Sequence, residues 1–308
     1  MIAETRQPIL TVGICVDMET ESALQIVDKS LHEADKIVIV TPNQELAKRL
    51  AKLDTVHVIL EEKREGKAAA MNKLLDSVEH GILVYASGDV MIGGDAISEL
   101  AAELRNDPGC GAVISHVMVA NRNQGLMGMI SNILWGLFNG VSSNLDKEAR
   151  LAQANDLYAF RRELVGNIPD GTINDDTFLA SSIVRKGFSV KVARVKVHVA
   201  GPTTPADYLV QRSRIVIGHI QTIKRLGLVP TVFEFTMASS PLSNLKIFVR
   251  TIAKGGLPSI VAACMMVPME ELTWVYAMAL SAARRDVKVW KQAVSTKNVL
   301  SHVEGELV

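Results

Sequence analysis

The sequence predicts an α/β fold with a Rossmann-like, mostly parallel sheet and a C-terminal helical segment. Three observations lead to this prediction. Short β-rich apolar runs alternate with helical patterns through the first half of the chain, these helical patterns are about 10–15 residues long, and residues 255–283 are almost uncharged. Such alternation implies βαβ units with right-handed crossovers, and therefore parallel strands. Ligands of such sheets bind beyond the carboxyl ends of the strands.

The predicted elements follow one another regularly up to residue 87. Their order is strand 9–16, helix 20–33, strand 36–40, helix 43–53, strand 56–60, helix 66–78 and strand 81–87. A helix is predicted at 95–104, and two more strands at 111–119 and 188–199 flank a less regular middle. We therefore expect the loops after Val16, Val40, Leu60 and Ser87 to line one pocket.

Composition indicates an ordered protein without a net positive charge that would attract nucleic acid. The 308 residues are 48% hydrophobic, and 33 basic residues balance 33 acidic ones. Cys15, Cys110 and Cys264 form no CxxC pattern, which argues against a disulfide framework and a thiolate zinc site. The seven histidines show no HxxxH spacing. Residues 1–10 do not resemble a secretory signal, so a reducing, cytoplasmic setting is expected.

Asp89 is a candidate metal ligand because it comes almost directly after the predicted strand 81–87. A carboxylate at the end of a strand lies where a metal-bound phosphate would be held, and divalent cations prefer oxygen ligands. The alternative is an aspartate that forms a turn or caps the following helix.

The segment REGKAAAMN (64–72) is a candidate phosphate site. It places Arg64, Gly66 and Lys67 at the opening of a predicted helix, with Asn72 further along. Gly66 allows close backbone approach, and a helix N-terminus attracts anions. The alternative is a solvated basic start of a helix.

Two further segments carry candidate functional residues. Asp175 and Asp176 precede an apolar helical pattern, where one could act as a base whose pKa its neighbour tunes, or both could simply cap the helix. Gln211, Arg212 and Arg214 lie on a later helical pattern. Guanidinium groups match phosphate geometry, although surface arginines on helices are common.

These segments together resemble family 2 glycosyltransferases, the inverting group with the A-type glycosyltransferase fold that includes cellulose, chitin and hyaluronan synthases. The motifs read GKAAAMN, SGD, NDDTFL and QRSRI in the family's order, and the likeness spans about residues 9–220. The resemblance implies transfer of a sugar from a nucleoside-diphosphate donor to an acceptor hydroxyl, with inversion and with Mg²⁺ or Mn²⁺. The tail 289–297 is similar to that of membrane-associated members.

The resemblance also implies roles for individual residues. Asp89 would bind the metal, Asp176 would be the base and Asp175 its partner, while Asp156 is a lesser candidate before the base. The donor-binding residues implied are Asp17, Thr41, Arg64, Lys67, Asn72, Gln211, Arg212 and Arg214. Three positions depart from the family. Thr41 and Asn43 stand where an acid usually follows the second strand, Ser87 replaces the first acid of the metal motif, and Ile215 replaces a tryptophan. The lost aromatic platform weakens the case for a processive polymer synthase.

Two other functions remain open at this stage. A nucleotidyltransferase also combines such a sheet with basic residues and an aspartate-bound metal, but its glycine-rich loop is missing from VDMETES (16–22). A non-catalytic subunit that binds sugar nucleotides is favoured by the lost acid after the second strand. The presence of both Asp89 and Asp176 argues against it.

The sequence divides into an expected catalytic domain, 1–235, and a helical region, 236–308, expected to associate with the membrane. Residues 255–283 would form a helix of about 44 Å, longer than the roughly 30 Å of bilayer hydrocarbon. Glu270 and Glu271 would fall near its middle, where an acid costs about 2.5–3.5 kcal/mol, and Pro258 and Pro268 would disturb it. We therefore expect a re-entrant or interfacial pair of helices.

Basic residues on both sides of this segment suit anionic headgroups on the cytoplasmic side of the cell membrane. They are Arg250, Lys254, Arg284 and Arg285. A lipid-linked acceptor would be presented there, and a glycan acceptor is the other possibility. The alternative structure is a helical hairpin buried against the catalytic domain or against a second copy in a homo-oligomer. The helical stretch 125–140 is expected to pack in a core, or else to rest on lipid.

Overall fold

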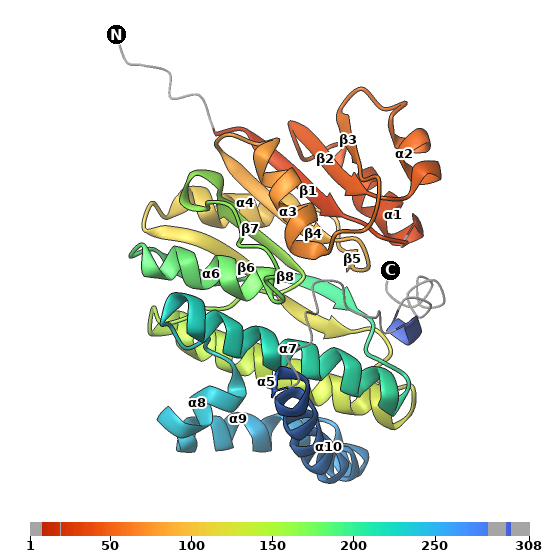
Figure 1. Cartoon of the computed structure of the whole chain (residues 1–308). Coiled ribbons are helices and arrows are strands. Elements are labelled where there is room, and N and C mark those ends of the chain that lie inside the picture. Colours follow the sequence, from red (N-terminus) through yellow and green to blue (C-terminus); the bar gives the residue numbers. More distant parts are fainter. Residues whose placement is uncertain (1–7, 19, 283–293, 297–308) are drawn as a thin grey trace.

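The structure, a computed structural model, describes residues 8–18, 20–282 and 294–296 (Figure 1). Its strands are β1 (Leu10–Cys15), β2 (Lys36–Thr41), β3 (Val56–Leu60), β4 (Ile82–Ser87), β5 (Met91–Ile92), β6 (Cys110–Val119), β7 (Leu157–Arg161) and β8 (Ser189–Val199). Its helices are α1 (Thr20–Ser30), α2 (Gln44–Leu50), α3 (Lys67–Asp76), α4 (Ala96–Asn106), α5 (Gly125–Lys147), α6 (Asp175–Arg185), α7 (Pro205–Leu226), α8 (Phe233–Ser239), α9 (Pro241–Lys254) and α10 (Gly256–Ala282). Short 3₁₀ helices cover Arg162–Leu164 and Val294–Thr296.

The eight strands form one mostly parallel sheet in the order β3-β2-β1-β4-β7-β6-β8-β5. Six strands run in one direction, because β7 is antiparallel to both β4 and β6, and β5 is antiparallel to β8. The chain moves outward from β1 to β2 and β3 on one side and continues with β4 on the other. The carboxyl ends of β1 and β4 thus meet at a topological switch point, where open α/β sheets bind ligands.

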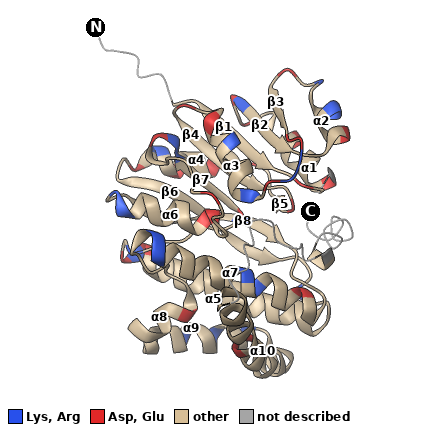
Figure 2. Ribbon diagram, in the orientation of Figure 1, with Lys and Arg blue, Asp and Glu red and all other residues tan. Residues whose placement is uncertain are grey.

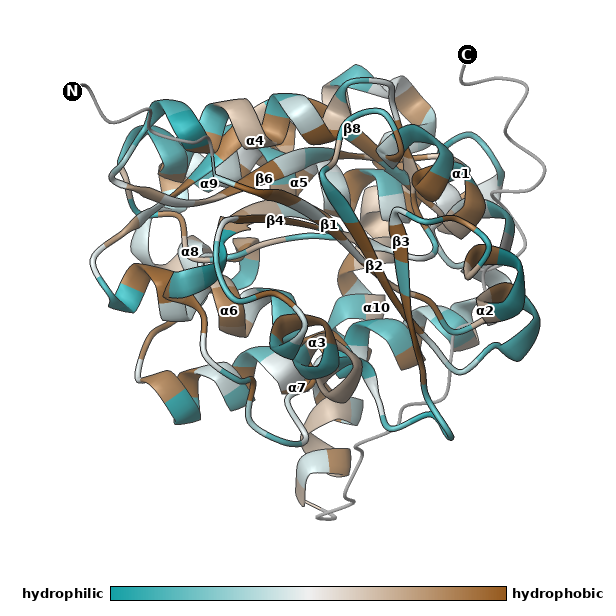
Figure 3. Cartoon of the chain, turned by 90° about the horizontal axis from the view of Figure 1, so that it is seen from above, coloured by the Kyte–Doolittle hydropathy of each residue, from teal (hydrophilic) through white to brown (hydrophobic). Residues whose placement is uncertain are grey.

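Helices cover both faces of the sheet (Figures 1 and 3). Alternate side chains of each strand point to opposite faces, so Ile37 and Ile39 pack in the core with α1, α2 and α4. Val38 and Val40 pack in the core of the other face with α3, α5 and α6. Seen from above, β1, β2 and β4 are strongly apolar between these layers (Figure 3).

This architecture confirms the predicted fold class and six predicted strands. Two strands were missed: the short β5, and the antiparallel β7, which directly follows Asp156. The core interpretation of 125–140 is confirmed, since α5 buries Met127, Ile130, Ile133 and Leu137.

The C-terminal helices lie together on the side of the molecule formed by α5 and α7 (Figure 1). In place of the expected pair of helices over 255–283, α10 is one continuous helix. Pro258 occupies its first turn, where no backbone donor is needed, and Pro268 lies inside it. By length and composition α10 is the one described helix that could cross a membrane. The predicted boundary at 235/236 falls within α8, and Arg284, Arg285 and residues 289–293 and 297 lie outside the described residues.

Candidate functional site

A cavity of about 350 Å³ opens at the carboxyl ends of the parallel strands. The loops after β1, β2, β3 and β4 all contribute, through Asp17, Pro42, Arg64 and Asp89 among others. This confirms the expectation that these four loops line one pocket. The opposite wall comes from α5, α7 and α8, so the cavity lies between the sheet edge and the helical layer.

Asp89 is positioned by the contact between the ends of β1 and β4. The Gly88 amide donates to the Cys15 carbonyl at 3.1 Å, and the Gly88 carbonyl accepts from the Ser22 hydroxyl at 2.5 Å. A Cβ at Gly88 would lie 3.0 Å from the Cys15 carbonyl oxygen and from the Val16 Cα, neither of which is free to move aside. The glycine of the SGD motif therefore allows the approach that brings half-buried Asp89 into the cavity.

Asp156 lies beside Asp89 although the two are 67 positions apart. It directly precedes β7, and its carbonyl accepts from the Ser87 amide at 2.9 Å, which fixes it next to the end of β4. Burial raises the pKa of the Asp156 carboxyl, Lys67 and Arg214 oppose the rise, and the negative charge of Asp89 adds to it. The resemblance ranked Asp156 as a lesser candidate, yet the structure places it at the centre of the site.

Asp89 and Asp156 fit a divalent cation that arrives with a phosphate ligand. Among the described residues, no group of three or more His, Cys, Asp or Glu side chains is arranged to hold a metal ion by itself. Mg²⁺ is commonly held by one or two carboxylates together with substrate phosphates, and Asp89 and Asp156 bring two carboxylates together at this edge of the sheet.

Half-buried Lys67 and buried Asp175 form an ion pair. Lys67 begins α3 and Asp175 begins α6; the ammonium nitrogen lies 3.6 Å from Asp175 Oδ1 and 5.3 Å from the centre of the Tyr85 ring. Asp175 is 1% exposed, and its Oδ2 has no hydrogen-bond partner in the described part of the chain. Burial lowers the pKa of Lys67, but the carboxylates of Asp175, Asp176 and Asp156 outweigh this and keep it charged.

Asp176 is the carboxylate best suited to accept a proton. It lines the cavity in the first turn of α6, and its Oδ1 accepts from the Thr177 amide at 2.6 Å. Burial raises its pKa to about 6, with Lys67 opposing the rise and Asp175 and Asp156 adding to it. A carboxylate with a pKa of about 6 is charged at neutral pH and is a stronger base than an ordinary aspartate.

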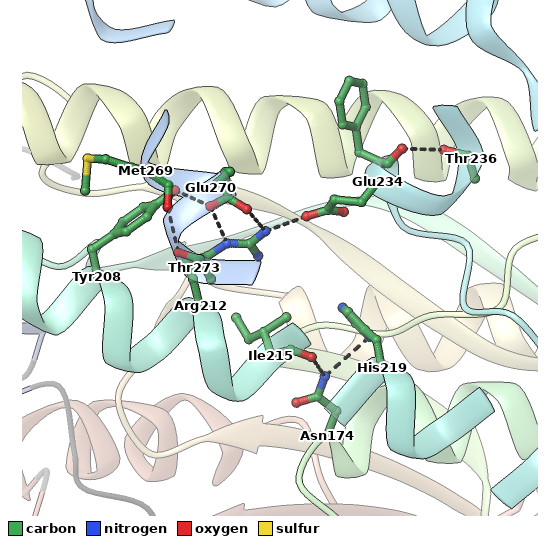
Figure 4. A network of polar contacts seen from close by, with 11 residues as sticks. Asn174, Tyr208, Arg212, Ile215, His219, Glu234, Thr236, Met269, Glu270 and Thr273 are labelled. Atoms are coloured by element: carbon green, nitrogen blue, oxygen red, sulfur yellow. Dashed lines mark hydrogen bonds and ion pairs between the residues drawn. The ribbon is translucent and has the colours of Figure 1, made fainter. Parts of the chain in front are cut away.

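The loop before Asp175 is fixed by α7 and α3. Asn174 donates to the Ile215 carbonyl at 2.9 Å (Figure 4), and a Cβ at Gly218 would lie only 2.3 Å from the Asn174 side chain. Asn72 clamps the same loop, because its amide both donates to the Ile168 carbonyl at 2.8 Å and accepts from the Ile168 amide at 2.7 Å. Asn72 thus supports the loop and does not line the cavity, which corrects the predicted role in donor binding.

Thr41, another residue predicted to bind the donor, does not border the cavity, which corrects that prediction. It is fully buried at the end of β2, and its hydroxyl accepts from the Asn43 amide at 3.1 Å. Asn43 in turn caps α2 by accepting from two amides of the first turn. Pro42 and Val40 line the cavity at this point.

Arg64 and Asp17 form the outer rim, with Arg64 Nε 2.7 Å from Asp17 Oδ2. Arg214 and Gln211, both predicted to bind the donor, line the inner wall from α7. The Nε of Arg214 is buried without a hydrogen-bond partner among the described residues, and its charge is close enough to lower the pKa of Asp156. Arg64, Lys67 and Arg214 thus provide three cations around the carboxylates.

Arg212 has a different set of contacts (Figure 4). Its Nε lies 2.9 Å from Glu270 Oε1 and its Nη2 lies 2.7 Å from Glu270 Oε2, and Nη2 also contacts Glu234. The Tyr208 hydroxyl donates to the same Glu270 carboxylate. Arg212 borders the cavity, and its guanidinium joins α7 to α8 and α10, so its predicted role in donor binding stays a prediction.

Sequence reasoning missed Glu61, a further acid of the site. Glu61 directly follows β3, is 6% exposed and borders the cavity, and its carboxylate lies 2.8 Å from the Lys73 ammonium. Glu61 follows a predicted strand, and the same feature singled out Asp89. The strand pattern was therefore sufficient to find Glu61. Thr296, in the short C-terminal 3₁₀ helix, also borders the cavity.

Comparisons with known proteins place this geometry in a known fold. No protein-family model matches the sequence, and no curated protein matches it. The chain is similar to a mannosyltransferase from Pyrobaculum calidifontis in complex with GDP-Man and Mn²⁺, with a TM-score of 0.58, 19% identity, and coverage of 92% of this chain and 88% of that chain. A glucosyl-3-phosphoglycerate synthase from Mycobacterium tuberculosis in complex with Mn²⁺, UDP and phosphoglyceric acid matches with a TM-score of 0.49, 17% identity, and coverage of 72% and 80%. The first likeness shows that this chain has the A-type glycosyltransferase fold.

Proposed function

We propose that this protein is a nucleotide-sugar-dependent glycosyltransferase that transfers its sugar with inversion. The observation that carries the proposal is the set of charged groups at one edge of the sheet. Asp89 and Asp156, the Asp175 and Lys67 pair, and Asp176 all border one cavity at the topological switch point. Sugar transfer from a nucleoside diphosphate needs a site for the diphosphate and a base for the acceptor, and this set supplies both.

Asp89 and Asp156 are the residues that would hold Mg²⁺ or Mn²⁺. When bound, such an ion neutralises charge that develops on the leaving diphosphate. Arg214 and Lys67 bring positive charge to the same place, and Arg64 lies at the outer rim. The related mannosyltransferase fold, crystallised with GDP-Man and Mn²⁺, supports a donor of this chemical class.

Asp176 would act as the general base. It would accept the proton of the acceptor hydroxyl while that oxygen forms its bond to the anomeric carbon, and the bond from this carbon to the diphosphate oxygen would break with the electron pair leaving on the diphosphate. A single displacement of this kind inverts the anomeric centre. Asp175, neutralised by Lys67, would place Asp176 and maintain the charge balance of the site.

The helical wall of the cavity indicates an acceptor with an apolar part. Leu134, Trp135 and Phe138 of α5 line it together with Val210 of α7 and Phe233 of α8. Apolar walls bind hydrocarbon or ring faces and release water. A lipid-linked acceptor fits this wall better than a purely polar glycan chain.

The test is a donor screen with the purified chain. Nucleoside-diphosphate sugars, beginning with GDP-mannose and UDP-glucose, are added with Mn²⁺ or with EDTA, and thermal unfolding is recorded. A donor at about 100 times its Kd stabilises the fold by about 2.7 kcal/mol, and we expect this only with metal. Released sugar and nucleoside diphosphate are then measured.

Each other outcome identifies a different function. Stabilisation without any release of nucleoside diphosphate, with or without acceptors, would indicate a binding subunit. Stabilisation by a nucleoside triphosphate and release of pyrophosphate with a sugar phosphate would indicate a nucleotidyltransferase. Absence of any donor effect would refute the proposal.

A further inference from the structure

The composition of α10 is inverted relative to a helix on the surface of a water-soluble protein. Five of its six buried positions carry small or polar residues, among them Ser259, Ala262 and Thr273, and the sixth is Met266. Large apolar side chains point outward instead, among them Leu257 (74% exposed), Val275 (64%), Met278 (63%) and Leu272 (53%). A soluble surface helix normally shows the opposite arrangement, with its apolar stripe toward the core. Small residues at helix contacts and large apolar residues facing outward are typical of helices in contact with lipid.

The charged residues of α10 leave its outward face almost entirely apolar. Glu270 and Glu271 are its two charged residues, and α10 is otherwise uncharged (Figure 2). Glu270 faces inward, where it pairs with Arg212 and accepts from Tyr208 (Figure 4). The outward face therefore carries Glu271 as its one acid, near the middle of an apolar stripe from 257 to 278.

Beside α10, α9 adds a basic stripe to this surface. Leu242 (76% exposed), Leu245 (51%) and Val249 (56%) form an outward apolar stripe at helical spacing. Lys246, Arg250 and Lys254 form a second exposed stripe next to it at a spacing of four residues, and α9 contains no acid. Both helices pack on α5 and on each other, so their outward faces lie on the same side of the molecule (Figure 1).

We propose that the outward surface of α9 and α10, the docking face, binds an anionic lipid bilayer with both helices lying in the plane of the membrane. Apolar side chains beside a row of Lys and Arg are what a headgroup boundary with negative charge accommodates. The buried positions of α10 extend from Ser259 to Ala277, so the protein covers one side of the helix along most of its length. That contact favours a helix lying on the surface over one that leaves the body to cross the bilayer.

The charge of the docking face favours a bilayer over a second copy of the chain as its partner. A two-fold contact through this face would bring one row of Lys246, Arg250 and Lys254 toward its own copy, and like charges repel. An anionic membrane provides the opposite charge for the same row. The docking face is also formed by helices that pack on α5 and α7, two walls of the cavity, so a bilayer there lies beside the apolar wall.

The test is flotation of the full chain with lipid vesicles. We expect binding to vesicles of phosphatidylcholine mixed with phosphatidylglycerol, weaker binding to phosphatidylcholine alone, and release as salt concentration rises. The variant K246Q/R250Q/K254Q should bind anionic vesicles on the order of 100-fold more weakly, since each basic residue near the surface contributes about five-fold. The matched control is K48Q/R49Q/K52Q, which removes three exposed charges around α2, at the other end of the molecule.

A second variant tests the apolar part. L257S/V275S/M278S changes three exposed side chains, so its thermal unfolding should match that of the parent, while vesicle binding should fall. Equal binding of the parent and both docking-face variants would overturn the proposal. So would a stable dimer that the apolar variant dissociates while neither lipid mixture binds the parent.

Discussion

Replacing Asp176 by asparagine is expected to stabilise the fold above about pH 6 although it removes the base. Burial raises the pKa of this carboxyl from 3.8 to about 6, so the folded protein disfavours its charged form. At a pH above both values the group is charged in the folded and the unfolded chain, and its burial then costs on the order of 3 kcal/mol. Asparagine has nearly the same shape and carries no charge, so this destabilisation is removed.

The sign of the effect gives a pH window. Below about pH 4 the carboxyl is neutral in both states, and the variant and the parent should have similar free energies of unfolding. Between about pH 4 and 6 the folded chain binds more protons than the unfolded one, so the parent loses stability as pH rises. The advantage of the variant should therefore grow through this interval and become constant above it.

The assay is chemical unfolding in EDTA at several pH values from 4 to 8, which keeps metal out and needs no donor. Asp28→Asn, an exposed acid on α1, is the matched control and should show little change at any pH. The reasoning about the site fails if Asp176→Asn gains no stability at pH 8, or if its gain is the same at pH 4 and pH 8.

Three further predictions concern Asp89, Asp176 and Glu270. Asp89→Asn should abolish the stabilisation that Mn²⁺ gives to donor binding in thermal unfolding, because an amide lacks the charge a hard cation prefers; an unchanged metal effect would exclude this ligand. Asp176→Asn should keep donor affinity but lower transfer by about 10²–10⁴-fold, and the parent rate should fall below about pH 6 as the base becomes protonated; a fully active variant would exclude this base. Glu270→Gln should lower the free energy of unfolding by about 3 kcal/mol, because Arg212 loses a buried partner. The exposed control Glu271→Gln should have almost no effect, and R212M/E270M should recover much of the loss. Equal effects of the two single variants would contradict the pairing.

The parallel part of the sheet was predictable because each of its strands is a separate apolar run that ends in turn residues. β7 was missed for a physical reason. Its residues Leu157–Arg161 run antiparallel between β4 and β6, and these partners are distant in sequence, so no local alternation of strand and helix marks it. Asp156 takes its place in the site from this strand, and its role could not be read from the spacing of the motifs.

Thr41 shows the limit of reasoning from strand ends. The last residue of a strand still follows its alternation of faces, so Thr41 points into the body of the sheet, whereas the next residue, Pro42, reaches the cavity. Asp89 and Glu61 lie past the ends of their strands and border the cavity. Both of these residues lie beyond a strand end, whereas Thr41, at a strand end, does not border the cavity.

Glu270 and Glu271 were the strongest sequence argument against contact of α10 with lipid, and the position of Glu270 in the fold removes half of that argument. The penalty for an acid in an apolar environment applies to a charge that faces the environment alone. Here the carboxylate turns away from the apolar stripe and pairs with Arg212, 58 positions earlier in the chain, a partner that helical periodicity could not identify. The same pairing holds the guanidinium of Arg212, a residue of the motif that the resemblance assigned to the donor. One ion pair therefore has two consequences: it engages the Arg212 guanidinium at the wall of the cavity, and it leaves Glu271 as the one acid on the outward face of α10.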